Sequence, residues 1–109
     1  MEAVRRDGIR AAVDRALDHV SGCEAIVVDC DIDVIDRAQC PGAPGARPGG
    51  MSADMFFEAA RYLGAVPQVK LVDLTEFDPS LDVSDITALT AARWVCEILA
   101  GYAARGAGK

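Results

Sequence analysis

The sequence predicts an α/β protein in which two adjacent parallel strands alternate with helices. Three amphipathic helical segments and two short apolar segments follow one another in the order helix, strand, helix, strand, helix. This alternation is typical of parallel strands joined by right-handed crossovers. The first strand is a continuous apolar run, as in strands that are buried on both faces of a sheet. Two strands make too small a sheet for such burial, so the element count predicts part of a larger domain.

The first half of the chain predicts a helix, a strand and an irregular loop. Apolar side chains recur at helical spacing over residues 2–20, with Gly8 weakening the first turns. Residues 25–28, Ala-Ile-Val-Val, predict the first strand. Residues 37–51, called the Pro/Gly loop below, hold three prolines and four glycines. A loop of this length without regular structure is usually functional.

The second half predicts a helix, a strand and a helix. Ser52 is the expected N-cap of a helix that runs to about residue 63, and Gly64 is its expected end. Residues 69–74 predict the second strand, and residues 86–103 predict the last helix, capped by Asp85 or Ser84. The apolar side chains of the last helix that are available for burial are Leu89, Val95, Cys96, Ile98, Leu99 and Tyr102.

Composition narrows the class of function. The 109 residues carry a formal charge of −6 and have a pI near 4.6, without the clustered basic face that nucleic-acid binding needs. The longest apolar stretch is far shorter than a membrane span, and no secretory leader is recognisable. The four cysteines form no Cys-x-x-Cys pair and are expected to be reduced. We therefore expect a cytoplasmic protein without a nucleic-acid or membrane partner.

Acidic residues gather where the first strand ends. Asp29, Asp31 and Asp33 would project from one face if the strand continued in extended conformation. The carboxyl ends of parallel strands form the ligand crevice of open α/β sheets, and carboxylate oxygens suit Mg²⁺, Ca²⁺ or Mn²⁺. A solvated acidic turn with a capping role would have the same pattern, and the spacing leaves both interpretations open.

Two known acidic motifs that bind divalent cations match these residues only in part. An EF-hand loop that begins at Asp29 needs glycine at its sixth position and glutamate at its twelfth, but Val34 and Cys40 stand there. Asp29 and Asp31 after an apolar strand resemble the Asp-x-Asp motif of haloacid-dehalogenase-like phosphatases. The chain lacks that group's usual residue at position 33 and its second acidic motif with a lysine. A Mg²⁺-dependent phosphatase stays as an alternative.

A more specific resemblance begins at the same aspartates. Asp31-x-Asp33, seven residues, Pro41-Gly42, seven residues and Gly50 resemble the third signature of the ureohydrolase family. That family contains arginase, agmatinase, guanidino-acid hydrolases and formimidoylglutamase. Residues 73–79, Asp-Leu-Thr-Glu-Phe-Asp-Pro, are similar to the family's acidic strand end, where Glu-x-Asn-Pro is commoner. Matching elements run in the family's order from residue 25 to about residue 99.

The resemblance implies a fold, a cofactor and site residues. It makes residues 1–109 the C-terminal part of a three-layer α/β/α domain, with the Pro/Gly loop at its active site. Asp31 and Asp33 fall on family aspartates that ligate a binuclear Mn²⁺ centre, which activates a bridging water. Glu76 falls on the acidic residue that binds the substrate. The implied reaction is hydrolysis of a guanidino or formimino compound, with agmatine or a guanidino acid preferred over formimidoylglutamate.

Three positions depart from the family pattern. Asp29 stands where serine is usual, Arg37 replaces a proline or small residue, and Asp78 replaces asparagine. We expect Arg37 to pair with Asp29 or Asp36 and so to offset the extra negative charge near the metal position.

Several family groups have no counterpart in the sequence. The Gly-Gly-Asp-His and Asp-Ala-His-x-Asp motifs, which complete the family's metal centre, do not occur, and His19 is the only histidine. Two carboxylates cannot by themselves hold a Mn²⁺ pair tightly. We therefore identify no catalytic residue, and we expect the isolated chain to be inactive and the full-length relatives to be homo-oligomers. The alternative is a truncated or self-associating module without catalytic function.

Overall fold

A computed structural model describes residues 1–106, which form two parallel strands and four α-helices. The strands are β1 (Ile26–Asp31) and β2 (Val69–Thr75). The helices are α1 (Glu2–Asp7), α2 (Ile9–Val20), α3 (Ala53–Gly64) and α4 (Ile86–Ala103), and short 3₁₀ turns, η1 (Ile32–Val34) and η2 (Pro79–Leu81), follow the strands. The predicted α/β class and parallel pairing are confirmed. The last three residues of the predicted 1–109 unit lie outside the described part.

The predicted first helix is two helices because Gly8 separates them. Gly8 has φ 86° and ψ 159°, a backbone conformation that residues with a Cβ rarely adopt. The described residues therefore contain one helix more than the three that the sequence predicts. On α1, Arg5 Nη2 donates a hydrogen bond of 2.7 Å to the carbonyl oxygen of Gly49, which ties this short helix to the Pro/Gly loop.

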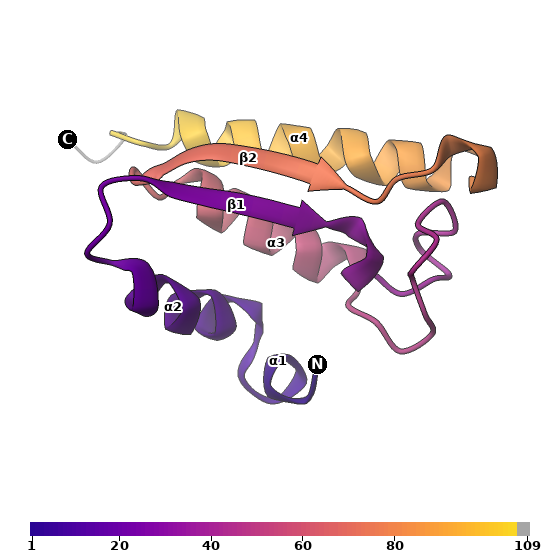
Figure 1. Ribbon diagram of the computed structural model, residues 1–109, viewed down its shortest axis with the longest axis horizontal. Coiled ribbons are helices and arrows are strands. Elements are labelled where there is room, and N and C mark those ends of the chain that lie inside the picture. The colour runs from indigo at the N-terminus through magenta and orange to yellow at the C-terminus, as the bar shows by residue number, and fades with distance from the viewer. Residues whose placement is uncertain (107–109) are drawn as a thin grey trace.

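The sheet is covered by helices on one face. Its strands pair with Asp29 opposite Asp73 and Asp31 opposite Thr75. Figure 1 shows α3 behind the strands, with α4 along one side and α2 along the other. The opposite face carries no helix among residues 1–106, and Val27 on this face is 65% exposed. The described residues thus supply the sheet and one helical layer of the three-layer arrangement that the family resemblance implies.

The core extends from the covered face of the sheet to the Pro/Gly loop. Its buried residues are Ile32, Ile35, Cys40, Ala43, Ala46, Phe56, Ala60 and Trp94. Three of them, Cys40, Ala43 and Ala46, belong to the loop and are completely buried. The loop is therefore irregular, as predicted, but it is packed into the protein. None of the helices described is long and apolar enough to cross a membrane.

The last helix packs with a different side from the predicted one. Leu89, Val95, Cys96, Leu99 and Tyr102 are exposed, and Leu89 reaches 67% exposure. Of the predicted set, Ile98 packs against the core. The buried residues of α4 are Thr87, Thr90, Trp94, Glu97 and Gly101. The prediction of the packed side was wrong because it rested on apolar side chains alone. The side of α4 that packs is the one where Gly101 lets the α3 backbone approach and where Thr87 and Glu97 form hydrogen bonds.

Two glycines allow the backbones of α3 and α4 to approach closely. A Cβ added at Gly64 would overlap the carbonyl oxygen of Ile98, and one at Gly101 would overlap the carbonyl oxygen of Arg61. Gly64 was predicted as a helix end, and it is also the last residue of α3. Its missing side chain serves the packing of the two helices, because no methyl group fits between the two backbones.

An ion-pair cluster with a buried carboxylate and two exposed arginine side chains lies beside this crossing. The Glu97 carboxylate accepts a hydrogen bond of 2.8 Å from Arg93 Nε and one of 2.6 Å from Arg61 Nε. The hydrogen bonds from Arg93 and Arg61 lower the pKa of Glu97 below its usual range. Arg93 also lies over the ring of Phe57, at 5.0 Å from its centroid. The charge on the packed side of α4 is therefore compensated.

Substitution of Gly101 by alanine tests the close crossing of α3 and α4. In a solvated helix this change is favourable by about 1 kcal/mol. Here we expect the free energy of unfolding to fall by about 1–3 kcal/mol, because the methyl group has to displace the α3 backbone. Urea unfolding of the 109-residue chain measures the change. Gly22→Ala is the control, since a Cβ there meets nothing within 4 Å. A Gly101→Ala chain of equal or greater stability would contradict the close approach.

Candidate functional site

β1 ends at Asp31 because the side chain of that residue turns the chain. Asp31 Oδ1 accepts a hydrogen bond of 2.9 Å from the backbone N–H of Asp33, and this bond caps the turn η1. The strand therefore does not continue in extended form to Asp33, as an alignment of all three aspartates would require. Asp29 and Asp31 keep the strand alternation and are exposed on the uncovered face of the sheet.

The Asp33 carboxylate contacts the Pro/Gly loop. Its Oδ1 accepts a hydrogen bond of 3.1 Å from the backbone N–H of Gly45. A Cβ added at Gly45 would overlap this carboxylate, so any other residue there would have to displace the Asp33 side chain. Gly42 and Gly50 belong to the sequence motif, whereas the role of Gly45 follows only from this contact.

The Pro/Gly loop begins and ends at a short parallel bridge between Ile35 and Met51. The N–H of Asp36 donates to the carbonyl oxygen of Met51, and the N–H of Met51 donates to that of Val34, both at 2.8 Å. A Cβ at Gly50 would lie 2.8 Å from the Val34 oxygen. Glycine at position 50 therefore allows the two ends of the loop to meet beside η1.

The Asp36 side chain joins the two ends of the loop. Its Oδ1 accepts a hydrogen bond of 2.9 Å from the N–H of Ala38, and its Oδ2 accepts one of 2.7 Å from the N–H of Gly49. The backbone N–H groups of Ala38 and Gly49 lower the pKa of the Asp36 carboxyl below its usual range. The ionised form of Asp36 thus stabilises the folded loop.

The Arg37 side chain stabilises the loop through hydrogen bonds to its carbonyl groups. Its Nη1 donates hydrogen bonds to the carbonyl oxygens of Ala46, at 3.1 Å, and Pro44, at 3.4 Å. The ion pairs among the described residues do not include Arg37 with Asp29 or Asp36, so the predicted pairing is wrong. The loop carbonyls bind this guanidinium instead, which the sequence could not indicate.

Gly42 connects the loop to two other segments. Its N–H donates a hydrogen bond of 2.8 Å to Thr87 Oγ1, at the start of α4. Its carbonyl oxygen accepts one of 2.8 Å from the N–H of Asp78, which follows β2. The loop is therefore fixed to the carboxyl end of β2 as well as to that of β1.

β2 brings Glu76 to the same edge of the sheet. Asp31 pairs with Thr75 in the register of the strands, and Glu76 comes directly after. Glu76 is exposed and has φ 71°, a left-handed conformation that turns the chain away from the strand. Asp78 Oδ1 then accepts hydrogen bonds from the N–H and hydroxyl of Ser80, at 2.9 and 2.6 Å. The three predicted site residues thus share the carboxyl edge of the sheet.

Asp85 occupies the N-cap position of α4, as predicted, but the side chain that caps the helix is that of Asp82. Its carboxylate accepts hydrogen bonds from the N–H groups of Thr87, at 2.9 Å, and Ala88, at 3.0 Å. Loss of solvation raises the pKa of Asp82, but the hydrogen bonds from Thr87 and Ala88 outweigh it and lower the pKa overall. The side chain of Asp85 makes no capping bond, because this residue has φ 59°.

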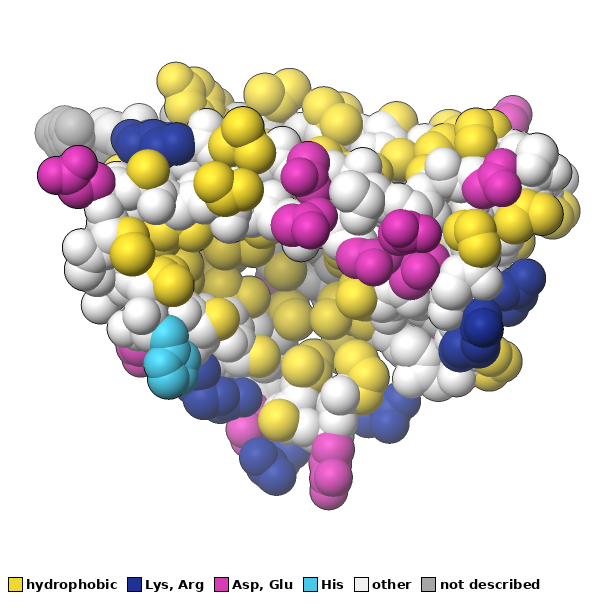
Figure 2. Space-filling model, in the orientation of Figure 1, with side chains coloured by type: hydrophobic (Ala, Val, Ile, Leu, Met, Phe, Trp, Pro, Cys, Tyr) yellow, Lys and Arg dark blue, Asp and Glu magenta, His cyan; other side chains and the backbone are white. Residues whose placement is uncertain are grey.

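Asp73 adds an acidic group that the sequence interpretation did not use. It lies opposite Asp29, and the hydrogen bond between the two side chains, together with their repulsion, raises the pKa of Asp29. Figure 2 shows the result as acidic side chains gathered over the strands, with hydrophobic side chains beside them. The uncovered face of the sheet is therefore acidic toward its carboxyl end.

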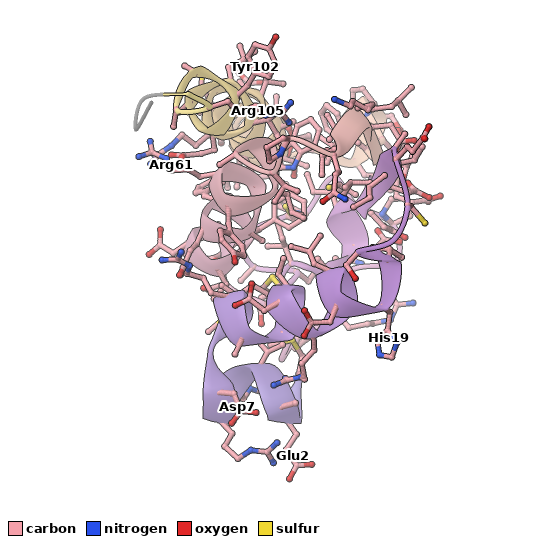
Figure 3. The ribbon with its side chains drawn as sticks, turned by 90° about the vertical axis from the view of Figure 1, so that its left-hand side faces the viewer. Glu2, Asp7, His19, Arg61, Tyr102 and Arg105 are labelled. Atoms are coloured by element: carbon pink, nitrogen blue, oxygen red, sulfur yellow. The ribbon has the colours of Figure 1, made fainter. Side chains whose placement is uncertain are left out.

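The sequence predicts Asp31 and Asp33 as metal ligands. The carboxylates of Asp31 and Asp33 are ligands that suit a hard divalent cation such as Mn²⁺. Residues 1–106 contain no group of three or more His, Cys, Asp or Glu side chains that could hold a metal ion. His19 is exposed and points outward from α2 (Figure 3). The two carboxylates thus fit Mn²⁺ chemically without completing a centre.

An acidic carboxyl edge bordered by a glycine-rich loop defines the chain as an α/β protein with a candidate ligand site at the strand ends. The family to which it belongs follows from comparison with known sequences. The model of the Arginase family matches residues 1–101. The chain belongs to the arginase family, and this assignment replaces the phosphatase interpretation of Asp29 and Asp31.

Relatives and solved structures agree with this assignment. Formimidoylglutamase of Bacillus subtilis strain 168 is 32% identical over 102 residues, which cover 93% of this chain and 32% of the relative. Agmatinase of Chromobacterium violaceum is 36% identical over 78 residues, 72% of this chain and 24% of the relative. The crystal structure of the B. subtilis formimidoylglutamase has a TM-score of 0.90 at 30% identity, over 96% of this chain and 33% of that one.

The fold is shared with more distant neighbours. Trypanosoma cruzi formiminoglutamase, solved with Mn²⁺, has a TM-score of 0.88 at 23% identity, over 95% of this chain and 34% of that one. This chain spans about a third of the length of the B. subtilis relative, 32% of its sequence.

The lowered pKa of Asp36 predicts how acid affects stability. Because its folded pKa lies below its unfolded value, the stabilisation is present above about pH 4 and is lost as the pH falls through the folded pKa. We expect Asp36→Asn to be less stable than the native sequence near neutral pH, with a difference that shrinks in acid. Thermal unfolding across this pH range measures the difference. Asp18→Asn, exposed on α2, controls for the lost charge, and a difference for Asp36→Asn that does not change with pH would contradict its role.

Proposed function

We propose that this chain supplies part of the metal and substrate site of a Mn²⁺-dependent hydrolase that cleaves a linear amidine C–N bond. The observation that carries this proposal is the position of Asp31 and Asp33 at the carboxyl edge of the sheet, beside the Pro/Gly loop, in a member of the arginase family. The chemistry of carboxylate ligands and the Mn²⁺ in a neighbour of the same fold support the choice of metal.

Asp31 and Asp33 are the proposed ligands from this chain. Each carboxylate accepts one backbone N–H through its Oδ1 atom, from Asp33 and Gly45 respectively. Bonds of this kind orient a ligand before the metal arrives. Bound Mn²⁺ would supply an activated water for attack on the amidine carbon. The remaining ligands would come from residues outside this chain, which agrees with its coverage of 32% of the B. subtilis relative.

Glu76 is the proposed substrate ligand. A guanidino or formimino group carries N–H donors, and a carboxylate can accept two of them in parallel. Glu76 is exposed immediately after the end of β2, and the neighbouring Asp78 is tied to Gly42 of the loop. These features would hold the backbone beside Glu76 while its carboxylate stays open to a ligand.

The proposed substrate is a formimino compound of the formimidoylglutamate type, with guanidino compounds as the second choice. The B. subtilis formimidoylglutamase aligns with 93% of this chain, whereas two agmatinase relatives align with 72% and 88%. This coverage favours the formimino branch over the agmatine that the sequence motif alone favoured.

A chimeric enzyme tests the function. The matching third of B. subtilis formimidoylglutamase is replaced by residues 1–101 of this chain, and Mn²⁺-dependent release of formamide from formimidoylglutamate is measured. We expect activity that falls at least about 100-fold on Asp31→Asn or Asp33→Asn, since metal ligands are lost. Glu76→Gln should raise KM more than it lowers kcat.

The control for this experiment is Asp54→Asn, an exposed carboxylate on α3, which should leave the activity unchanged. A folded chimera that is inactive on both formimino and guanidino substrates would refute the function. Activity that survives Asp33→Asn would refute the ligand assignment.

The chain by itself is proposed to be inactive and to bind Mn²⁺ weakly. Two carboxylates leave most of the coordination to water, so metal affinity lacks the contribution of further protein ligands. Calorimetry of the 109-residue chain with Mn²⁺ should give a weak isotherm, and assays with formimidoylglutamate and agmatine should give no turnover. A tight two-site isotherm, or turnover by the purified chain, would be incompatible with this proposal.

A further inference from the structure

Thr87 is a completely buried polar residue in the first turn of α4. Its side chain contacts a distant segment, whereas Thr90, one turn later, donates its hydroxyl to the carbonyl oxygen of Ile86 in the same helix at 3.0 Å. The Thr87 oxygen instead accepts the N–H of Gly42, 45 residues away in the sequence. Both threonines are buried, but they have different hydrogen-bond partners. Comparing substitutions at the two positions therefore separates the effect of losing the contact with Gly42 from the effect of losing a buried hydroxyl.

Asp82 fixes the backbone at Thr87. Its carboxylate accepts the backbone N–H of Thr87 at 2.9 Å and that of Ala88 at 3.0 Å. The Thr87 hydroxyl oxygen carries two lone pairs, and one of them accepts the N–H of Gly42. Asp82, Thr87 and Gly42 therefore form a continuous chain of hydrogen bonds from the helix start to the loop.

Gly42 fits closely between two segments that border the proposed substrate side. A Cβ added there would lie 3.0 Å from Thr87 Oγ1 and 3.1 Å from Cε2 of Phe77. Phe77 follows Glu76 directly, and the N–H of Asp78 holds the Gly42 carbonyl oxygen at 2.8 Å. The position of Gly42 is therefore coupled to the backbone on the C-terminal side of Glu76.

The loop also connects Gly42 to Asp33, on the proposed metal side of the site. Three residues after Gly42, the N–H of Gly45 binds Asp33 Oδ1. Between and beside them, Ala43 and Ala46 are completely buried, and the N–H of Ala46 donates to the carbonyl oxygen of Ala43 at 3.1 Å. Packing and backbone hydrogen bonding leave this part of the loop little freedom to shift on its own.

We propose that Thr87, whose backbone is fixed by Asp82, is a positioning residue of the site. By holding Gly42 it sets the Pro/Gly loop against both strand ends, and so places Gly45 against Asp33 and supports the backbone beside Glu76. The inference rests on the proposed function in assigning these carboxylates to metal and substrate. The hydrogen bond that holds the loop can be tested without that assignment.

Amide hydrogen exchange tests the hydrogen bond directly in the 109-residue chain. Thr87→Val keeps the shape of the side chain and removes the acceptor, so the Gly42 amide should exchange about tenfold faster or more. Thr90→Val is the matched control and should leave Gly42 protected. Thr87→Ser retains the hydroxyl and should restore protection. Equal exchange of Gly42 in the native chain and in a folded Thr87→Val chain would overturn the inference.

Kinetics of the chimeric enzyme test the consequence for the site. Thr87→Val should lower kcat/KM by about 10- to 100-fold, mainly through KM, since a displaced loop misplaces groups that bind the substrate. Thr87→Ser should recover most of the loss, and Thr90→Val should have little effect. Equal losses for both valine variants would overturn the positioning role. An inactive native chimera would refute the proposed function, while hydrogen exchange would still decide whether Thr87 holds the loop.

Discussion

The backbone of the Pro/Gly loop has to satisfy its hydrogen bonds without a helix or a sheet, and the architecture of the carboxyl edge depends on how it does so. Buried Ala43 and Ala46 carry their peptide groups into the protein, where an unpaired N–H or C=O would be costly. Side chains supply the acceptors that regular structure cannot. Asp33, Asp36 and Thr87 each accept a loop N–H.

This constraint gives the aspartates at the end of β1 two roles. Asp31 ends the strand by accepting the N–H of Asp33, and Asp33 holds the loop through Gly45. The alternatives of a capping acidic turn and a ligand pair are therefore compatible in one structure. Carboxylates that are oriented by backbone N–H groups still present their second oxygen to a ligand, and such pre-orientation is what an efficient metal ligand needs.

The sequence predicted those parts of the fold that depend on local signals. The first strand, expected at 25–28, is Ile26–Asp31, and the helix expected to run to about residue 63 is Ala53–Gly64. Ser52 caps that helix by accepting the N–H of Met55 at 3.3 Å, as expected. Periodicity, a capping residue and a helix-ending glycine act within a few residues of one another, so they can be read without knowledge of tertiary structure.

The features that were missed depend on residues far apart in the chain. Gly101 is needed because the carbonyl oxygen of Arg61 approaches it, and Thr87 is buried because Gly42 needs an acceptor. The partner of Arg37 could not be chosen without the loop carbonyls in place. In the candidate site, the residue types and their order along the chain were predictable, whereas the contacts that orient them were not.

The uncovered face of the sheet bears on how the chain behaves in solution. Exposed Val27 and Leu71 lie on the same face as Asp29 and Asp73, so apolar patches and carboxylates share one surface. Near neutral pH the charges keep this surface hydrated and make copies of the chain repel one another. Asp29, with its raised pKa, loses charge early on acidification, as the whole chain approaches its pI near 4.6. The chain is therefore least protected against face-to-face stacking in mildly acidic solution, where its colloidal stability is lowest.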